Sequence, residues 1–186
     1  MLPNFFLPGT QKSGTTTLFE LMRQHPEIYI PAIKTPEILC RKDYNSSFSL
    51  YEDFYAETTK KHKAIGDLSQ GYYYNLDVPR RIIESFPEDI KLIFIYREPV
   101  SRAISAYWQV FKIPVGRHFS YMEERSIEEV FNLEASSINE LIQLEDQKLK
   151  QALKEGKVTG DFNTPYEEKL FPLYYLRNSR YSYYLK

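Results

Sequence analysis

The sequence predicts an α/β fold in which helices flank a central parallel sheet. Two observations lead to this prediction. A strand, a loop and a helix follow one another at least twice along the chain, and the strands are continuous apolar runs without alternation. The chain has 186 residues, 42% of them hydrophobic, which is enough to bury a sizeable core. We therefore expect a single domain spanning residues 1–186.

The first strand–loop–helix unit lies at the N-terminus. Residues 4–7 (NFFL) form a short apolar run that stops at Pro8-Gly9, as a buried strand does when it enters a loop. Residues 15–25 then read as a helix, with Leu18, Leu21 and Met22 on one face and a proline directly after its end.

The second unit lies in the middle of the chain. Residues 91–96 (KLIFIY) are rich in branched and aromatic side chains and predict a central buried strand. A helix is expected over residues 99–110, with Ile104, Tyr107 and Trp108 on one face. Two further helices are expected, a short one at 79–86 that begins with a proline and a long one at 137–155.

Composition excludes several classes of protein. Lys and Arg total 24 and Asp and Glu total 25, so any bound anion must be held by a local cluster and bulk nucleic-acid binding is not expected. The single cysteine, Cys40, excludes an internal disulfide framework and a Cys-rich zinc site. No apolar run approaches the roughly 18 residues that span a bilayer. We expect a cytoplasmic protein, or a Golgi luminal one if the chain is an excised domain.

The loop between the first strand and its helix is suited to a phosphate. It reads Gly9-Thr10-Gln11-Lys12-Ser13-Gly14-Thr15-Thr16. The glycines allow a close backbone approach, and the helix start offers unpaired N–H groups and a positive dipole end. Hydroxyl donors and one lysine charge complete the set. The loop is not a Walker A motif, because Lys12 precedes the second glycine instead of following it. A polar turn with a surface lysine is the alternative.

A second anion site is predicted after the strand at 91–96. Arg97 lies at the carboxyl end of that strand, where α/β sheets place ligands, and Ser105 follows two helical turns later. The alternative is a helix start with two solvated arginines. A triphosphatase often has a magnesium-binding aspartate at such a strand end, and this chain has an arginine. The pair of loops indicates a nucleotide with two separated phosphates and no required metal.

These residues resemble a known family. PNFFLPGTQKSGTTTLFELMRQHPEI resembles the 5′-phosphosulfate loop of sulfotransferases that use 3′-phosphoadenosine 5′-phosphosulfate (PAPS), and KLIFIYREPVSRAISAYW resembles their 3′-phosphate segment. The likeness is closest to the heparan-sulfate and bacterial branch. Weaker likenesses lie at Lys34-Thr35-Pro36, at Gly66-Asp67-Leu68-Ser69 and at Ser179-Arg180-Tyr181. The resemblance implies a P-loop-like three-layer fold. Because family domains generally continue further, it also implies a truncated or divergent C-terminus.

The resemblance also implies roles for individual residues. Lys12 would stabilise the leaving phosphate, and Ser13, Gly14, Thr15 and Thr16 would cradle it. Arg97 and Ser105 would bind the 3′-phosphate, with Arg180 and Tyr181 closing over it. The base that takes the acceptor's proton is less determined, because Thr35 and Asp67 stand where relatives have Glu. The candidate bases are Glu37 and Asp67.

The expected activity is therefore sulfuryl transfer from PAPS to a hydroxyl or amine of a small-molecule, carbohydrate or carrier-bound acceptor. Two other interpretations remain open: a P-loop nucleotide kinase or NTPase, and a non-catalytic module that binds adenosine bisphosphate. The tyrosine run at 72–74 would either line an acceptor cleft or pack in the core.

Overall fold

The structure is a computed structural model, and it describes residues 1–34, 36–112, 121–160 and 173–184. These residues form two compact units. Unit 1 comprises residues 1–97, and unit 2 comprises the described residues from Glu98 onward. Each unit is considered by itself below. None of the helices in the described part of the chain is long and apolar enough to cross a membrane.

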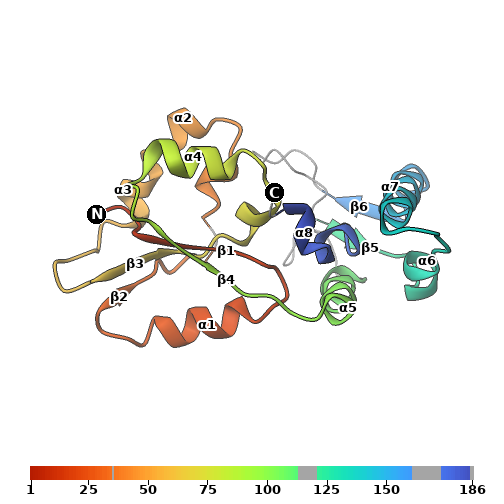
Figure 1. The fold of residues 1–186 in the computed structure, drawn as a ribbon, viewed down its shortest axis with the longest axis horizontal. Coiled ribbons are helices and arrows are strands. Elements are labelled where there is room, and N and C mark those ends of the chain that lie inside the picture. Colours follow the sequence, from red (N-terminus) through yellow and green to blue (C-terminus); the bar gives the residue numbers. More distant parts are fainter. Residues whose placement is uncertain (35, 113–120, 161–172, 185–186) are drawn as a thin grey trace. The chain divides into compact units, whose positions relative to one another are not determined.

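Unit 1 is built on a four-stranded parallel sheet (Figure 1). Its strands lie in the order β2-β3-β1-β4, and each adjacent pair is parallel. On β1, Phe5 lies opposite Gly66 of β3 on one side and Lys91 of β4 on the other. The predicted parallel sheet is thus confirmed. The strands are β1 (Phe5–Gly9), β2 (Ile28–Tyr29), β3 (Ala64–Asp67) and β4 (Lys91–Phe94).

Helices cover both faces of this sheet, which makes unit 1 a three-layer structure. Successive side chains of β1 point to opposite faces. Phe6 packs in one cluster with residues of α3 and α4, whereas Phe5 and Leu7 pack in another with Phe19 of α1. Figure 1 shows α1 on one side of the sheet and α3 and α4 on the other. The helices are α1 (Thr15–Met22), α2 (Tyr44–Ser47), α3 (Leu50–Phe54) and α4 (Val78–Ser85), with 3₁₀ turns η1 (Ile38–Cys40) and η2 (Gln70–Tyr74).

The run KLIFIY was predicted to be a central buried strand, and this is wrong for the sheet that the described residues form. β4 lies at the edge of that sheet, and Leu92 and Phe94 are 48% and 39% exposed. β1 holds an interior place instead, and all five of its residues are buried. An apolar run predicts a strand, but its place in the sheet depends on which strands pair with it, and that is a non-local property.

The predicted helices are confirmed, with small differences in the residues at which they end. The side chains that they bury differ more from the prediction. α1 ends at Met22, three residues earlier than predicted, and Leu21 is 59% exposed while Phe19 is buried. On the helix at 99–110, Trp108 is exposed and Tyr107 is buried. The tyrosines of the 72–74 run are all buried, so they pack in the core of unit 1.

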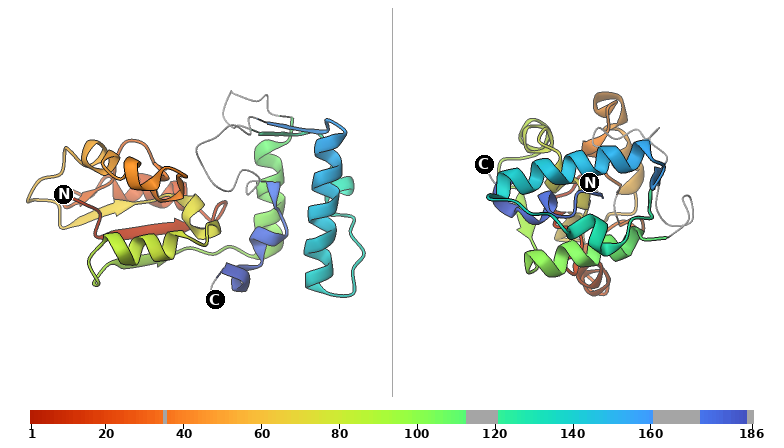
Figure 2. Two further views of the ribbon diagram at one scale, coloured as in Figure 1. Left: turned by 90° about the horizontal axis from the view of Figure 1, so that it is seen from above. Right: turned by 90° about the vertical axis from the view of Figure 1, so that its right-hand side faces the viewer.

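Unit 2 is formed mainly by helices around an apolar cluster of its own. Residues of α5, α6, α7 and β6 join this cluster, and Figure 2 shows that the axes of α5 (green) and α7 (blue) are roughly parallel. β5 and β6 pair in antiparallel fashion. The elements of unit 2 are α5 (Pro99–Val110), β5 (Tyr121–Glu123), α6 (Ile127–Phe131), α7 (Ile138–Lys154), β6 (Val158–Gly160), η4 (Arg177–Ser179) and α8 (Tyr181–Tyr184).

Arg102 joins α5 to the C-terminal part of unit 2. Its side chain is fully buried, its Nε donates to Ser179 Oγ at 2.8 Å and its Nη2 donates to the carbonyl of Tyr175. A charged donor contributes more than a neutral one in a buried hydrogen bond, because the local dielectric is low. The segment that carries Arg180 is therefore held on α5 by a buried guanidinium.

Replacing Arg102 by Ala should lower the free energy of unfolding by about 2–4 kcal/mol, because two buried acceptors lose a charged donor and a cavity opens. Urea unfolding followed by circular dichroism measures the change. Lys150→Ala is the control: Lys150 forms an exposed ion pair with Asp146 on α7, so its loss should cost at most about 1 kcal/mol. Equal effects of the two substitutions would contradict the anchoring role of Arg102.

Candidate active site

The loop between β1 and α1 has the backbone that an anion site requires. Gly14 precedes α1 with φ of +92°, a left-handed conformation that glycine adopts without steric cost. The backbone of Lys12 is also left-handed, with φ of +70°. Because Gly14 has no side chain, it provides no side-chain acceptor for the first N–H groups of α1. Those groups and the positive end of the helix dipole therefore face the loop.

Hydrogen bonds within the loop and to its neighbours hold the loop in place. Thr10 Oγ1 and Ser13 Oγ are 2.6 Å apart, and the backbone N–H of Thr10 donates to the carbonyl of Ile95 after β4. The N–H of Gln11 donates to the hydroxyl of Tyr74 in η2. The loop shape is thus fixed by contacts with two other segments.

The two predicted anion loops meet within unit 1. Arg97 follows β4, and its Nη1 donates to the backbone carbonyl of Lys12 at 3.3 Å. The parallel pairing of β1 with β4 brings this contact about, because the carboxyl ends of parallel strands lie at the same edge of a sheet. The Arg97 guanidinium therefore lies against the backbone of the loop that carries Lys12.

A second lysine joins the loop, and the sequence analysis gave it no role. Lys34 Nζ donates to Thr16 Oγ1 at 2.6 Å and lies 3.2 Å from Thr15 Oγ1, at the start of α1. Burial and the charge of Lys12 lower its pKa to about 8. The contact between Lys34 and Thr16 joins residues 18 positions apart, so no short stretch of sequence reveals it. The only sequence signal for Lys34 was its place in the segment Lys34-Thr35-Pro36.

We expect the Lys34 ammonium to titrate near pH 8, well below an ordinary lysine, because a half-buried cation beside Lys12 is disfavoured. The folded chain then binds this proton more weakly than the unfolded chain. The charged lysine therefore destabilises the fold below about pH 8, and this cost fades as pH rises from about 8 to the ordinary pKa of 10.5. NMR of ¹³C-labelled lysine side chains measures the titration, and Lys34→Arg assigns the signal. Lys12→Met should raise the pKa of Lys34, because it removes a neighbouring positive charge. If every lysine titrates in the ordinary range, the arrangement is wrong.

Glu37 and the loop between β1 and α1 both contact η2. Its backbone has φ of +50°, its N–H donates to Ser69 Oγ at 2.9 Å, and its carboxylate accepts from the N–H of Gly71. The same turn contacts the loop between β1 and α1, since the Tyr74 hydroxyl accepts from the N–H of Gln11 and Tyr73 packs on Gly9. Burial, with a smaller contribution from the charge of Asp67, raises the pKa of Glu37 to about 7. A half-buried carboxyl with this pKa is suited to general-base chemistry.

Asp67 was the other candidate base, and its surroundings do not fit direct proton transfer from an acceptor. The residue is 1% exposed. Its Oδ1 accepts from the N–H and hydroxyl of Ser69, and its Oδ2 accepts from the hydroxyls of Tyr51 and Tyr72. Burial raises the pKa of Asp67, and these donors partly offset the effect. A carboxylate enclosed in this way has no face left for a substrate hydroxyl.

Unit 2 carries the other residues that were predicted to hold the 3′-phosphate. Ser105 is half-buried on α5, Arg180 donates to the side chain of Asn139 at 2.6 Å, and Tyr181 begins α8. The N-terminus of α5 is capped by Glu98, whose carboxylate accepts from the N–H groups of residues 100 and 101.

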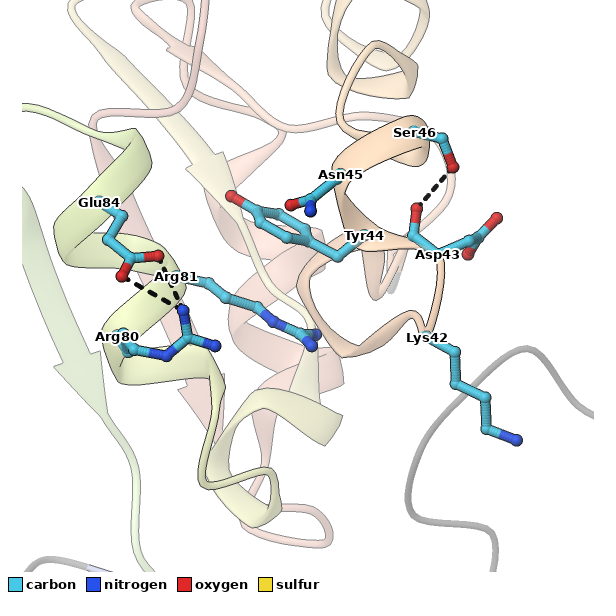
Figure 3. A pocket seen from close by; sticks show the side chains of 8 residues that line it. All are labelled: Lys42, Asp43, Tyr44, Asn45, Ser46, Arg80, Arg81 and Glu84. Carbon is cyan, nitrogen blue, oxygen red and sulfur yellow. Dashed lines mark hydrogen bonds and ion pairs between the residues drawn. The ribbon is translucent and has the colours of Figure 1, made fainter.

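An open pocket of about 360 Å³ lies elsewhere on unit 1, between α4 and the segment that contains α2 (Figure 3). None of the predicted site residues lines it. Its charges are largely paired, since Arg80 binds Glu84 and the Arg81 guanidinium packs over the ring of Tyr44. The lining residues are Lys42, Asp43, Tyr44, Asn45, Ser46, Arg80, Arg81 and Glu84.

Comparison with known proteins identifies the family of this chain. Residues 2–139, which include both anion loops, match the profile of the family described as "Sulfotransferase domain". The chain belongs to this sulfotransferase family. The resemblance inferred from the two loop motifs is thereby confirmed.

Individual relatives match over only part of their length. Heparan sulfate glucosamine 3-O-sulfotransferase 3B1 of Mus musculus is 32% identical over 108 residues, which cover 58% of this chain and 27% of that protein. Membrane-associated sulfotransferase kil1 of Dictyostelium discoideum is 32% identical over 163 residues, covering 84% of this chain and 33% of that protein. The chain thus spans about a quarter to a third of these curated relatives.

The fold has a counterpart among solved structures. The crystal structure of a sulfotransferase from Alicyclobacillus acidocaldarius matches with a TM-score of 0.58 and 23% identity, and the match covers 100% of this chain and 67% of that one. At this identity the likeness bears on the fold alone. It agrees with the predicted three-layer α/β fold of the P-loop-like kind.

Proposed function

We propose that this chain carries out sulfuryl transfer from PAPS to an acceptor hydroxyl or amine. The observation that carries the proposal is the contact between the two anion loops, with Arg97 hydrogen-bonded to the backbone of Lys12. Family membership supports the reaction type, since residues 2–139 match the sulfotransferase domain. A donor with phosphate groups at two ends is the ligand that two adjoining cationic loops fit.

Each loop takes one end of the donor. Ser13, Gly14, Thr15 and Thr16 bind the 5′-phosphosulfate through N–H and hydroxyl groups at the start of α1. Arg97 binds the 3′-phosphate. Ser105, Arg180 and Tyr181, which belong to unit 2, keep in this proposal the nucleotide-binding roles that the family resemblance implies. Lys34 supports the first loop through its bonds to Thr15 and Thr16. When an anion binds there, it also restores the charge of this lysine, because a nearby negative charge raises a lysine pKa.

The reaction is an in-line displacement at sulfur. The acceptor oxygen or nitrogen forms a bond to sulfur while the bond from sulfur to the 5′-phosphate oxygen breaks, and adenosine 3′,5′-bisphosphate leaves. Negative charge grows on the bridging oxygen, and the Lys12 ammonium stabilises it more in the transition state than in the ground state. The transferred group carries less charge than a γ-phosphoryl, so the proposal needs no metal.

Glu37 takes the acceptor's proton in this proposal. It is the better of the two candidate bases because it is only half-buried, whereas Asp67 is enclosed by four donors. Its raised pKa also makes the Glu37 carboxylate a stronger proton acceptor than that of an ordinary glutamate. Above a pH of about 7 the group is still largely ionised and can act as a base. Several relatives are named as sulfotransferases of heparan sulfate glucosamine, so a sugar hydroxyl is the acceptor proposed first.

Calorimetric titration with adenosine 3′,5′-bisphosphate tests the donor site. Lys12→Ala and Arg97→Ala should each weaken binding about 10- to 100-fold, since each removes a charge-assisted contact to phosphate. Wild-type affinity should be the same with magnesium and with a chelator. Lys42→Ala, in the pocket beside α4, is the matched control and should bind like the wild type. Unchanged affinity in both loop variants would refute the site, and magnesium-dependent binding of ATP would favour a kinase.

The pH dependence of transfer tests the base. A base works in its ionised form, so kcat/KM for the acceptor should rise with pH and level off above about 7, the pKa of Glu37. Glu37→Gln should remove this rise and lower kcat by about 10²–10⁴-fold, with bisphosphate affinity unchanged. The assay follows labelled sulfate from PAPS into N-sulfated heparosan, a simple phenol and an amine. A variant with the wild-type profile would exclude Glu37 as the base.

A further inference from the structure

Asp67 is the centre of a buried hydrogen-bond network that is connected to Glu37. The Asp67 carboxylate accepts the hydroxyl of Ser69 on Oδ1 at 2.5 Å and the hydroxyl of Tyr72 on Oδ2 at 2.8 Å. A hydroxyl that donates its hydrogen to a carboxylate has only lone pairs left for its other partners. The two hydroxyls are therefore oriented as acceptors.

Both hydroxyls accept N–H groups from the segment that carries Glu37. Ser69 Oγ accepts the N–H of Glu37 at 2.9 Å, and Tyr72 Oη accepts the N–H of Leu39 at 3.2 Å. The two oxygens of one carboxylate thus hold, through two side chains, the backbone on either side of Ile38. This is where the chain takes the left-handed turn at Glu37 and enters η1. Such a backbone conformation persists where the surroundings fix it.

The Glu37 side chain is held from the same region. The N–H of Gly71 donates to its carboxylate, and a Cβ at Gly71 would lie only 2.9 Å from Oε1. Any larger residue at position 71 would have to displace the carboxylate. Backbone and side chain of Glu37 are therefore both fixed by the segment that runs from Asp67 to Tyr72.

We propose that Asp67 is a positioning residue: through Ser69 and Tyr72 it fixes the place of the Glu37 carboxylate. The inference rests on the proposed function for its catalytic meaning, because it takes Glu37 as the base. Its structural content is independent of that assignment. It explains why an acidic side chain lies in the core of unit 1, with each carboxylate oxygen accepting two hydrogen bonds, at a point where no substrate reaches.

The chain offers a matched control in Tyr51. Its hydroxyl also donates to Asp67 Oδ2, at 2.9 Å, and the residue is fully buried like Tyr72. Among the contacts described for unit 1, the Tyr51 hydroxyl accepts no N–H from the segment at 37–39. Tyr51→Phe and Tyr72→Phe therefore remove the same group from the same carboxylate oxygen, and only the second breaks the connection to Glu37.

The test measures the pKa of Glu37 directly, by NMR of ¹³C-labelled glutamate carboxyls in the full 186-residue chain, with Glu37→Gln to assign the signal. Ser69→Ala and Tyr72→Phe should bring this pKa down from about 7 toward the ordinary 4.5, because the released carboxyl becomes hydrated. Asp67→Asn should have the same effect, since it also removes a nearby negative charge. Tyr51→Phe should leave the value near 7.

Transfer kinetics provide the second measurement. Ser69→Ala and Tyr72→Phe should lower kcat by at least about tenfold and leave the affinity for adenosine 3′,5′-bisphosphate unchanged, because a misplaced base affects the chemical step and not donor binding. If Tyr51→Phe shifts the Glu37 pKa as much as Tyr72→Phe does, or if neither Ser69→Ala nor Tyr72→Phe shifts it, the positioning role is overturned.

The two proposals fail in different ways. If Glu37→Gln retains full transfer activity while Ser69→Ala and Tyr72→Phe still shift the pKa of Glu37, the base assignment is wrong and the positioning of Glu37 stands. If Glu37→Gln abolishes transfer and the pKa is the same in all four network variants, Glu37 is the base but Asp67 does not place it.

Discussion

The arrangement of the candidate site depends on close packing around the 3₁₀ turn η2. A Cβ at Gly9 would lie 3.0 Å from Tyr73 Cβ, so the loop between β1 and α1 approaches the turn as closely as glycine allows. On the same turn, Gly71 lets the Glu37 carboxylate reach the backbone. One five-residue turn thus sets the positions of the anion loop and of the proposed base. A side chain at either glycine would push one of them away.

Several cationic side chains lie at one edge of the sheet, and their mutual repulsion raises the free energy of the folded protein. Lys12 lies near Lys34, whose pKa falls to about 8, and Arg97 is bonded to the backbone of Lys12. Like charges in a partly buried place repel one another. In the proposed function an anionic donor relieves this repulsion, so the charges that repel one another also favour its binding. Preorganised charge of this kind is a common source of catalytic stabilisation.

The two candidate acids show how burial assigns roles to similar groups. Asp67 has both carboxylate oxygens occupied by hydroxyl and amide donors, and Glu37 retains partial exposure with a pKa near neutrality. Charge and residue type alone do not distinguish them, which is why both remained candidates on the sequence. Contacts with distant residues separate them: Asp67 binds Tyr51, 16 positions away, and Glu37 binds Ser69, 32 positions away.

The sequence by itself determined the features that are local. These features are patterns of consecutive residues: a glycine-bounded loop between an apolar strand and a helix, and an arginine directly after a second strand. Only the tertiary structure decided what depends on pairing and burial: the edge place of β4, the contact of Lys34 with α1, and the enclosure of Asp67. These depend on contacts between distant segments, and no short window of sequence contains them.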